Sequence, residues 1–427
     1  MDGPELYEDI FPFDAPPRIV GVRGEVALTD TTLRDGQQGW RYLSVEEGLR
    51  IYEVLTELGG SGAILTTEVF LYTEKDRELA RRIKELGYRY PEPIAWIRAT
   101  RSDLGLVLDS GLETAAILAS ISDYHIFFKL GVDRDTAFRK YLEVVEEALR
   151  HGLRVKVTLE DVTRASLEKN VRPFVEALMR LEERYGTEII IKLADTLGVG
   201  LPLPDVPPPR GIPALIRYII NEVGFPGSRL EFHSHNDLGL VVANHLAAWY
   251  YGAALSNCTL FGIGERAGNC PLEIMLVHYA GIMGRESRAN LRAIRKAAQL
   301  FRELGLNIPE FYPLIGENAF RTKAGIHVDG LIKNPRVYLP FDPYEVLGVP
   351  YSVAINPYSG RAAIALWLSY RLGNGDGRNV ASLKNDPRVM AIYNEILEIF
   401  RRGRASPMTD DEMAEIASKY FPELREV

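Results

Sequence analysis

The sequence predicts a (β/α)8 barrel, also called a TIM barrel, followed by a mostly helical C-terminal region. Three observations lead to this fold class. Short apolar runs alternate eight times with amphipathic stretches between residues 26 and 283, which is typical of parallel βα units. No glycine-rich dinucleotide loop follows the first run, which disfavours a doubly wound sheet. A chain of 427 residues has room for a barrel and a smaller second part.

The expected strands are short runs rich in apolar and β-branched residues. We place them at residues 26–29, 63–70, 94–98, 115–120, 155–160, 189–193, 230–233 and 257–261. The expected helices between them repeat apolar residues at a spacing of three to four. They cover residues 44–58, 75–86, 103–110, 134–151, 167–184, 212–223, 240–251 and 271–283. Ser44 and Glu47 predict a capping box at the first helix.

The chain divides into three expected regions. Residues 1–24 form an acidic, proline-containing arm that looks like neither a signal peptide nor a transit peptide. Residues 25–284 form the barrel, in which the Pro- and Gly-rich stretch 198–213 predicts an extended loop after the sixth strand. Residues 285–427 form the second region. Its helical patterns cover residues 289–304, 361–372, 387–403 and 410–420, around a polar, Pro-dotted stretch at 309–357.

Composition limits the possible partners. The formal net charge is −8, which argues against nucleic-acid binding and against a membrane-surface protein. No apolar run reaches the length that spans a bilayer. The two cysteines, Cys258 and Cys270, provide no disulfide framework and suit a reducing compartment. We therefore expect a cytoplasmic protein without nucleic-acid or membrane partners.

The first candidate site residues follow the first strand. The stretch 30–38 reads Asp-Thr-Thr-Leu-Arg-Asp-Gly-Gln-Gln and leads into a helix, which is where a barrel carries its chemistry. Arg34 and Asp35 on this loop can place a fixed cation and a hard oxygen ligand over one cavity. The alternative interpretation is an ordinary turn.

Further candidate metal ligands follow the seventh and eighth strands. His233 and His235 end the seventh strand, and alternate residues of a strand point to the same side. Asn269 offers a neutral oxygen in the loop 262–269, next to strand one across the barrel closure. This set lacks a thiolate, because we interpret Cys270 as a packed thiol. It favours Mn²⁺, Mg²⁺, Co²⁺ or Zn²⁺. The alternatives are a hydrogen-bonded histidine pair and a tight glycine turn.

Three motifs carry a resemblance to a known superfamily. The stretch 30–38, His-Ser-His-Asn-Asp at 233–237 and Gly-Glu-Arg-Ala-Gly-Asn at 264–269 resemble the DRE-TIM metallolyases. Within that superfamily the chain is similar, over about residues 25–366, to Claisen-type synthases that join acetyl-CoA to a 2-oxo acid. The resemblance implies that Arg34 polarises the keto oxygen and that Glu160 is an active-site acid. It also implies a divalent metal held by Asp35, His233, His235 and Asn269.

Two further motifs of these synthases match the second region. Residues 323–330 resemble the histidine motif of the family, and residues 359–361 resemble its Ser-Gly-Lys/Arg signature. The resemblance implies a homodimer whose C-terminal region contributes to the active site of the partner subunit. It further implies that His327 helps acetyl-CoA to lose its methyl proton and that Tyr351 belongs to the same machinery. By its neighbours alone, His327 would be a loop histidine.

Polar and charged side chains predict the acceptor that the site takes. The expected substrate-binding residues are Gln38, Glu68, Arg98, Ser122, Lys156, Thr158 and Thr196. Arg98 and Lys156 could each pair with a second carboxylate, so we expect a dicarboxylic 2-oxo acid. Alternatively, either residue could form a salt bridge with Glu68 or Asp195 and touch no ligand. Thr196 resembles the family hydroxyl that binds the first carboxylate.

Shorter runs at residues 67–72, 90–92, 95–99 and 122–127 resemble the Re-citrate synthases. This resemblance implies condensation of acetyl-CoA with oxaloacetate. Homocitrate synthase, with 2-oxoglutarate, and isopropylmalate or citramalate synthase, with 2-oxoisovalerate or pyruvate, are the alternatives. A superfamily lyase or carboxyltransferase is disfavoured by the His327 and 359–361 motifs. A non-catalytic metal-binding regulator is disfavoured by Arg34 and Glu160.

Overall fold

The computed structural model describes residues 25–322, 325–372 and 379–425. The expected N-terminal arm, residues 1–24, lies outside the described residues. The described residues form two compact units, one up to residue 293 and one from residue 294, and each is described by itself. No helix within the described ranges is long and apolar enough to cross a membrane.

The first unit contains a closed barrel of eight parallel strands in sequence order. The strands are β1 (Ala27–Asp30), β2 (Ile64–Val69), β3 (Glu92–Arg98), β4 (Thr114–Ser120), β5 (Arg154–Glu160), β6 (Ile189–Asp195), β7 (Leu230–Ser234) and β8 (Leu255–Cys258). β1 pairs with β8 and closes the barrel. This architecture confirms the predicted fold class.

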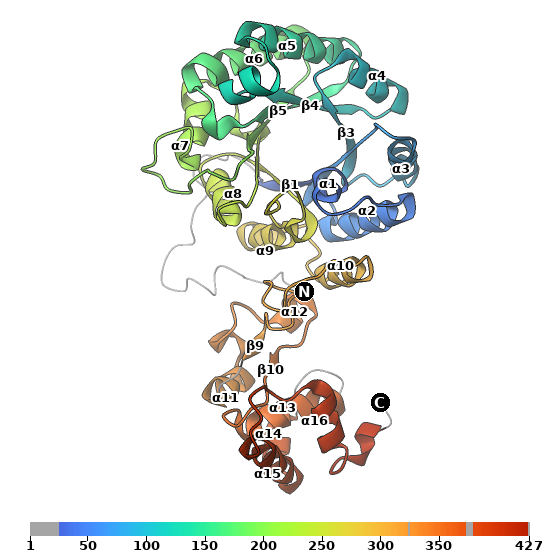
Figure 1. Ribbon diagram of the computed structural model, residues 1–427, viewed down its shortest axis with the longest axis vertical. Helices are drawn as coiled ribbons and strands as arrows, with labels where there is room; N and C mark the ends of the chain where they lie inside the picture. Colours follow the sequence, from blue (N-terminus) through green and yellow to red (C-terminus); the bar gives the residue numbers. More distant parts are fainter. Residues whose placement is uncertain (1–24, 323–324, 373–378, 426–427) are drawn as a thin grey trace. The chain divides into compact units, whose positions relative to one another are not determined.

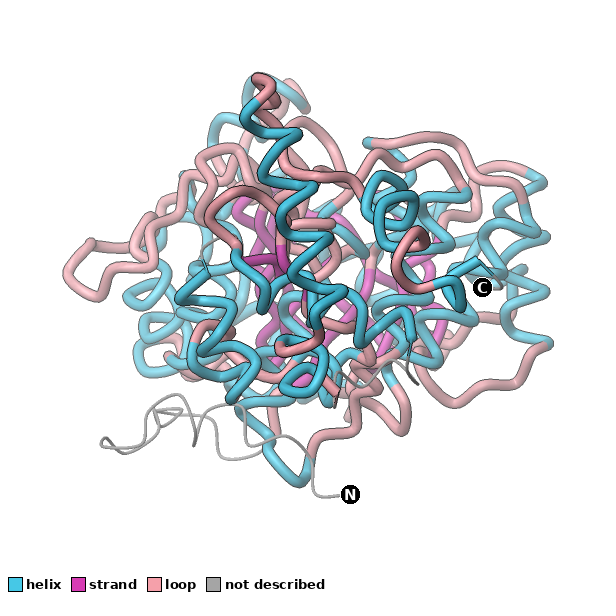
Figure 2. The backbone as a smooth tube through the Cα atoms, turned by 90° about the horizontal axis from the view of Figure 1, so that it is seen from below, coloured by secondary structure: helices cyan, strands magenta, loops and turns pink. Residues whose placement is uncertain are grey.

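Helices surround the strands, as Figures 1 and 2 show. They are α2 (Val45–Gly59), α3 (Glu74–Glu85), α4 (Arg101–Ser110), α5 (Arg134–Arg150), α6 (Arg172–Tyr185), α7 (Ile212–Arg217), α8 (Val241–Tyr250) and α9 (Leu272–Met283). The predicted capping box is present, because Ser44 and Glu47 exchange side chain and backbone hydrogen bonds. Amphipathic helices on the outside and apolar strands on the inside bury one continuous core.

The eighth strand begins and ends earlier than the sequence predicts. It covers Leu255–Cys258, and the 3-10 turn η7 (Leu260–Gly262) follows it. Phe261 in this turn has a φ of 57°, which a strand cannot accommodate. Leu260 and Phe261 are buried, so their apolar character reflects packing in a turn rather than a place in the sheet.

Short helical turns occupy two strand ends where the sequence shows no helical period. The π-helical turn η1 (Thr32–Gly36) and the short α1 (Gln37–Gly39) follow β1. The π-helical turn η2 (Tyr124–Lys129) follows β4. Irregular turns of this kind often carry functional side chains, and these two place Asp35 and Lys129 at the carboxyl ends of the strands.

The second unit is mostly helical, as predicted. Its helices are α10 (Ala293–Glu303), α11 (Gly325–Lys333), α12 (Pro343–Leu347), α13 (Gly360–Leu372), α14 (Val380–Lys384), α15 (Pro387–Arg401) and α16 (Asp410–Ala417). The buried α13 packs against α11, α14 and α15. A parallel pair of short strands, β9 (Arg321–Thr322) and β10 (Ser352–Val353), completes the unit.

Candidate active site

A cavity of about 230 Å³ opens at the carboxyl ends of the barrel strands. Eight residues that the sequence singled out line it. They are Arg34, Asp35, Gln38, Thr158, Glu160, Thr196, His233 and His235. Seven residues that we did not single out also line it, namely Trp96, Leu118, Lys129, Lys192, Ala194, Glu265 and Arg266. Residues from far-apart stretches of the chain thus converge at the face where barrels carry their sites.

Asp35, His233 and His235 face one another at this cavity. Asp35 Oδ2 lies 3.6 Å from His233 Nε2 and 3.8 Å from His235 Nε2. All three side chains are buried, and their ligand atoms lie within 4.8 Å of one another. The two distances are too long for hydrogen bonds. They are short enough for the three atoms to reach a single ion.

Neighbouring residues set which nitrogen of His233 faces Asp35. Asn257 Nδ2 donates to Thr29 Oγ1 at 2.9 Å, so Asn257 presents its oxygen to His233. His233 Nδ1 lies 2.9 Å from that oxygen and therefore carries the proton. Nε2 therefore carries the lone pair, and it is the nitrogen that faces Asp35. Fixing the tautomer of a ligating histidine in this way is typical of metal sites.

Asn269 lies beside the same group. Its backbone pairs with His235 in an antiparallel bridge, and its Nδ2 donates to Asp35 Oδ2 at 3.0 Å. Asn269 Oδ1 is buried and has no hydrogen-bond partner. Nδ2 also donates to the Ile263 carbonyl at 3.2 Å, so both amide hydrogens have acceptors. A buried, unpaired amide oxygen next to a carboxylate and two imidazoles fits a divalent cation.

The charges of this group favour metal binding. Burial lowers the pKa of His233 well below its usual value, and burial also lowers the pKa of His235. Both imidazoles are therefore neutral at neutral pH, which is the form that binds a metal. Burial raises the pKa of Asp35, but the charge of Arg34 and the hydrogen bond from Asn269 oppose this effect, and the pKa is lowered. Asp35 is a carboxylate.

Arg34 is held rigidly at the edge of the cavity. Its Nε and Nη2 donate to Glu68 Oε2 at 3.3 and 3.1 Å. Its guanidinium carbon lies 5.0 Å from the centre of the Trp96 ring, and Nη1 is 3.2 Å from Asp35 Oδ1. A guanidinium fixed by a carboxylate and an aromatic ring is a preorganised positive charge. Glu68 therefore positions Arg34 and does not itself line the cavity.

Buried charges alternate in sign through the barrel interior. Lys192 on β6 pairs with Glu68 on β2, which lies across the barrel, and is 3.9 Å from Glu231 Oε1. Lys156 Nζ donates to Glu231 Oε2 at 2.6 Å. These side chains are almost completely buried, so each needs a partner of opposite charge. Lys156, expected at the acceptor, is held by Glu231 and does not line the cavity.

Lys192 lines the cavity although the sequence analysis did not single it out. It sits in the apolar run Ile189–Asp195 of β6, and a lysine inside such a strand was the available signal. Burial lowers the pKa of Lys192, and Glu68 opposes that effect. Burial raises the pKa of Glu68, but Lys192 and Arg34 outweigh it and lower the value. The two groups form an ion pair.

Glu160 ends β5 and faces the cavity. Lys129 Nζ donates to its two oxygens at 2.9 and 2.8 Å, and Ser120 donates to the same carboxylate. His125 Nδ1 lies 3.0 Å from Glu160 Oε2. Burial raises the pKa of Glu160, but the close contact with His125 and the charge of Lys129 outweigh it and lower the pKa to about 2. Glu160 is therefore ionised at neutral pH.

Arg98 and Ser122, which we also expected at the acceptor, lie outside the cavity as well. Arg98 donates from Nε and Nη2 to Asp103, each at 2.9 Å, and its side chain is 62% exposed. Arg98 therefore forms a salt bridge instead of lining the cavity, as the alternative interpretation expected, and its partner is Asp103. Ser122 is buried and donates to Asp161 Oδ2 at 2.5 Å. This bond joins the loop after β4 to the residue that follows β5.

The remaining cavity side chains offer hydroxyl and amide groups. Thr158 Oγ1 is buried without a hydrogen-bond partner, and Gln38 comes from α1. Thr196 Oγ1 accepts from the Asp161 backbone N–H at 2.8 Å. Arg266 donates to the Thr196 carbonyl at 2.6 Å and to Asp237 at 2.8 Å. A small polar ligand would meet donors on several sides of the cavity.

His327 and Tyr351 lie in the second unit. His327 on α11 is exposed, and its ring centre is 4.3 Å from that of Tyr338. Tyr351 packs edge-on against Tyr370 and lines a cavity of about 820 Å³ within this unit. Burial raises the pKa of Tyr351. Lys323 and Ala324 of the histidine motif lie outside the described residues.

Comparisons with known proteins agree with these motifs. The HMGL-like family model matches residues 25–301, and the "homocitrate synthase post-HMGL domain-like" model matches residues 314–372. A citrate (Re)-synthase of Clostridium kluyveri is 41% identical over 100% of this chain and 96% of its own length. A citrate (Re)-synthase of Syntrophus aciditrophicus is 37% identical over 99% of this chain and 69% of its own. A 2-phosphinomethylmalate synthase of Streptomyces hygroscopicus is 40% identical, with coverages of 98% and 97%.

Solved structures show the same barrel. The hydroxymethylglutaryl-CoA lyase of Pseudomonas aeruginosa aligns with a TM-score of 0.53 at 20% identity. The alignment covers 66% of this chain and 94% of the lyase. At this identity the likeness concerns the fold. Motifs, barrel and full-length relatives agree, and the chain belongs to the HMGL-like family within the DRE-TIM superfamily.

Proposed function

We propose that this chain is an acyltransferase of the citrate (Re)-synthase type. It condenses the methyl carbon of acetyl-CoA with the keto carbon of oxaloacetate, and water then cleaves the thioester to give citrate and CoA. The observation that carries the assignment is the similarity, along the whole chain, to two citrate (Re)-synthases. The geometry of the barrel cavity supports the reaction class.

Asp35, His233, His235 and Asn269 would hold the divalent cation, because they supply one carboxylate, two neutral imidazoles and a spare amide oxygen. We propose Mn²⁺, Mg²⁺, Co²⁺ or Zn²⁺. When bound, such an ion acts as a Lewis acid on the carbonyl of the 2-oxo acid. The donor set lacks a thiolate and therefore leaves the choice among these ions to measurement.

The protein's own groups prepare the electrophile. Arg34 presents a fixed positive charge beside the same cavity, where negative charge develops on the keto oxygen during attack. Thr196 presents a hydroxyl for the first carboxylate. Glu160 is a carboxylate at neutral pH and holds the Lys129 ammonium group at the cavity. Each of these three side chains lines the cavity.

The positive charges of the cavity support a dicarboxylic acceptor. Lys129, Lys192 and Arg266 line it in addition to Arg34, beside the carboxylates of Asp35, Glu160 and Glu265. Trp96, Leu118 and Ala194 supply its apolar lining. We propose Lys129 for the second carboxylate, because its ammonium group pairs with Glu160 inside the cavity lining and its side chain is 45% exposed, whereas that of Lys192 is 1% exposed. This residue takes the part that the sequence analysis assigned to Arg98 and Lys156.

The sequence motifs at residues 323–330 and 359–361 support a part for the second unit in catalysis. We propose a homodimer in which the C-terminal unit takes part in catalysis and His327, assisted by Tyr351, removes the methyl proton of acetyl-CoA. We also place the enzyme in the cytoplasm, since both cysteines are free thiols.

A second candidate function comes from the 2-phosphinomethylmalate synthase, which is as similar over its full length as the citrate (Re)-synthases. Citrate carries a carboxymethyl group on the malate skeleton, and 2-phosphinomethylmalate carries a phosphinomethyl group there. Both products need a 2-oxo acid with a second anionic group. The cavity with its extra lysines suits either acceptor.

Thiol release from acetyl-CoA separates these functions. The metal-loaded enzyme is offered oxaloacetate, its analogue with a phosphinate in place of the distal carboxylate, 2-oxoglutarate, 2-oxoisovalerate and pyruvate. We expect the highest kcat/KM with oxaloacetate. A preference for the phosphinate would favour the second candidate, and a preference for 2-oxoglutarate or 2-oxoisovalerate would overturn the substrate. No release with any acceptor would overturn the enzyme assignment.

A further inference from the structure

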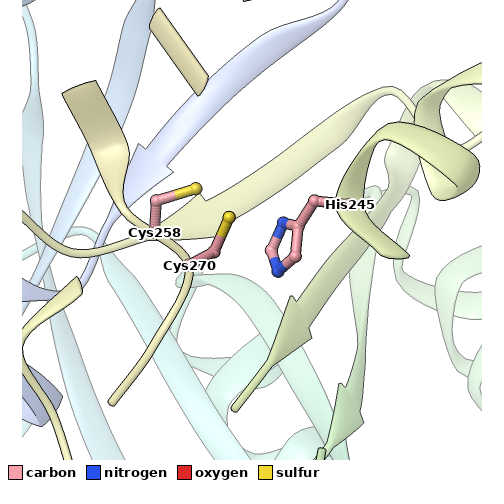
Figure 3. A group of neighbouring side chains, drawn as sticks. All are labelled: His245, Cys258 and Cys270. Carbon is pink, nitrogen blue, oxygen red and sulfur yellow. The ribbon is translucent and has the colours of Figure 1, made fainter. Parts of the chain in front are cut away.

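Both cysteines of the chain meet a buried histidine in the wall of the barrel (Figure 3). Cys258 ends β8, Cys270 lies on the following loop, and His245 lies on α8. Ligand atoms of the three side chains lie within 4.8 Å of one another, and all three residues are fully buried. The chain has two cysteines and seven histidines in 427 residues. Their meeting at one point is therefore a specific feature of the fold.

The backbone holds the two thiols in neighbouring segments. Thr259 N donates to Cys270 O at 3.0 Å, and Leu272 N donates to Thr259 O at 2.8 Å. These two hydrogen bonds hold the loop after Asn269 beside the end of β8. Cys258 and Ser256, two residues apart on β8, point to the same side of the strand. That side faces α8, because Ser256 Oγ lies 2.6 Å from His245 Nδ1.

The imidazole is available as a ligand. Burial lowers the pKa of His245 to about 3, so the ring is neutral and carries a lone pair. Nδ1 is engaged by Ser256, and Nε2 is buried without a hydrogen-bond partner. Ser256 Oγ in turn lies 3.4 Å from Cys258 Sγ. A hydroxyl that contacts both an imidazole and a thiol can steady both ligands of a bound ion.

We propose that His245, Cys258 and Cys270 form a second metal site, for a thiophilic ion of the Zn²⁺ class. Two sulfurs and one imidazole nitrogen are the donors that such ions prefer. Binding displaces one proton from each thiol and changes no oxidation state. The site at the cavity has only oxygen and nitrogen donors and therefore has a different preference among metal ions. The two sites are thus separate in position and in chemistry.

The expected consequence is structural. An ion at this site would join α8, the end of β8 and the loop that carries Asn269, since Cys270 follows Asn269 directly. The ligands are fully buried, so the ion has to enter while the chain folds. Loading therefore has to be done during expression, and a chelator applied to the folded protein removes the cavity ion first.

Cobalt distinguishes the two sites. The full-length protein is produced in Co²⁺-supplemented medium, treated with EDTA in the folded state, and analysed for bound cobalt and for absorbance. A thiolate-to-cobalt charge-transfer band in the near ultraviolet reports only the proposed site. We expect about one EDTA-resistant cobalt per chain together with this band.

The matched variants are Cys258→Ser with Cys270→Ser, and separately Asp35→Asn. We expect the double variant to lose the band and the resistant ion, and Asp35→Asn to keep both. If the double variant does not fold, the wild-type protein alone tests the proposal. Unfolding the wild-type protein in denaturant should release the EDTA-resistant ion and expose two free thiols. No EDTA-resistant ion and no band in wild-type protein would overturn the proposal. Recovery of Cys258 and Cys270 as a disulfide would also overturn it.

Discussion

Lys156 and Glu231 form a buried ion pair inside the barrel, with 2.6 Å between Lys156 Nζ and Glu231 Oε2. Their side chains are 1% and 0% exposed. The lysine was expected to meet the acceptor, whereas in the structure it neutralises a glutamate in the barrel interior. A structural role and a substrate-binding role predict different results for the same variant.

We expect Lys156→Met to lower the free energy of unfolding by about 3 kcal/mol, because it leaves the Glu231 carboxylate buried without its closest partner. The double variant Lys156→Met/Glu231→Met should recover most of the loss. Urea unfolding followed by circular dichroism measures both. An unchanged stability with a raised KM for oxaloacetate would instead place Lys156 at the substrate.

We expect Lys129→Gln to raise the KM for oxaloacetate about tenfold, because it removes one charge-assisted hydrogen bond to the second carboxylate. The KM for acetyl-CoA should stay the same. Arg98→Gln is the matched control, since Arg98 pairs with Asp103 outside the cavity, and it should change neither constant. A raised oxaloacetate KM in Arg98→Gln alone would reverse the two assignments.

The sequence predicted the barrel because its signals are local. Strand and helix periods and the Ser44 capping box each arise within a few residues, so seven of the eight strands lie close to their expected places. The eighth strand was misplaced because buried turn residues such as Phe261 look like strand residues. The turns η1 and η2 have no period of their own and could not be predicted.

The candidate metal group was predictable because a barrel brings strand ends together, so Asp35, His233 and His235 needed no knowledge of side-chain packing. The interior charges were different. Lys156 and Glu231 stand 75 positions apart, and only the closed barrel shows that they meet. Lys129 reaches Glu160 from an unpredicted turn. Pairings across a fold are not encoded in any short pattern.

The affinity for the cavity ion should change little between pH 7.5 and 6.5. Protons compete with a metal for imidazole, but burial lowers the pKa of His233 and His235 below the usual value of 6.5. Both rings are thus less protonated across this range than ordinary histidines, and affinity should fall mainly at more acidic pH. Calorimetric titration with Mn²⁺ measures it. A loss of about threefold over this single pH unit, the value for two imidazoles with the usual pKa of 6.5, would show that both rings titrate normally.

Mixing two inactive variants tests the homodimer. Asp35→Asn should inactivate the barrel site and His327→Gln the C-terminal contribution. If each site takes its barrel from one subunit and His327 from the other, subunit exchange should restore about a quarter of the wild-type activity. Mixing each variant with itself is the control. No recovery, with exchange confirmed by mass spectrometry of tagged subunits, would contradict a contribution from the partner.

The central claim is that a divalent ion held by Asp35, His233 and His235 supports condensation. The most direct measurement is metal content and thiol release in Asp35→Asn beside Asp133→Asn. Asp133 is an exposed helix N-cap, and asparagine caps equally well. We expect Asp35→Asn to lose the EDTA-removable ion and its activity to fall by at least about a thousandfold. We expect Asp133→Asn to keep the ion and the activity. An Asp35→Asn enzyme that condenses acetyl-CoA with oxaloacetate at the wild-type rate would contradict the claim.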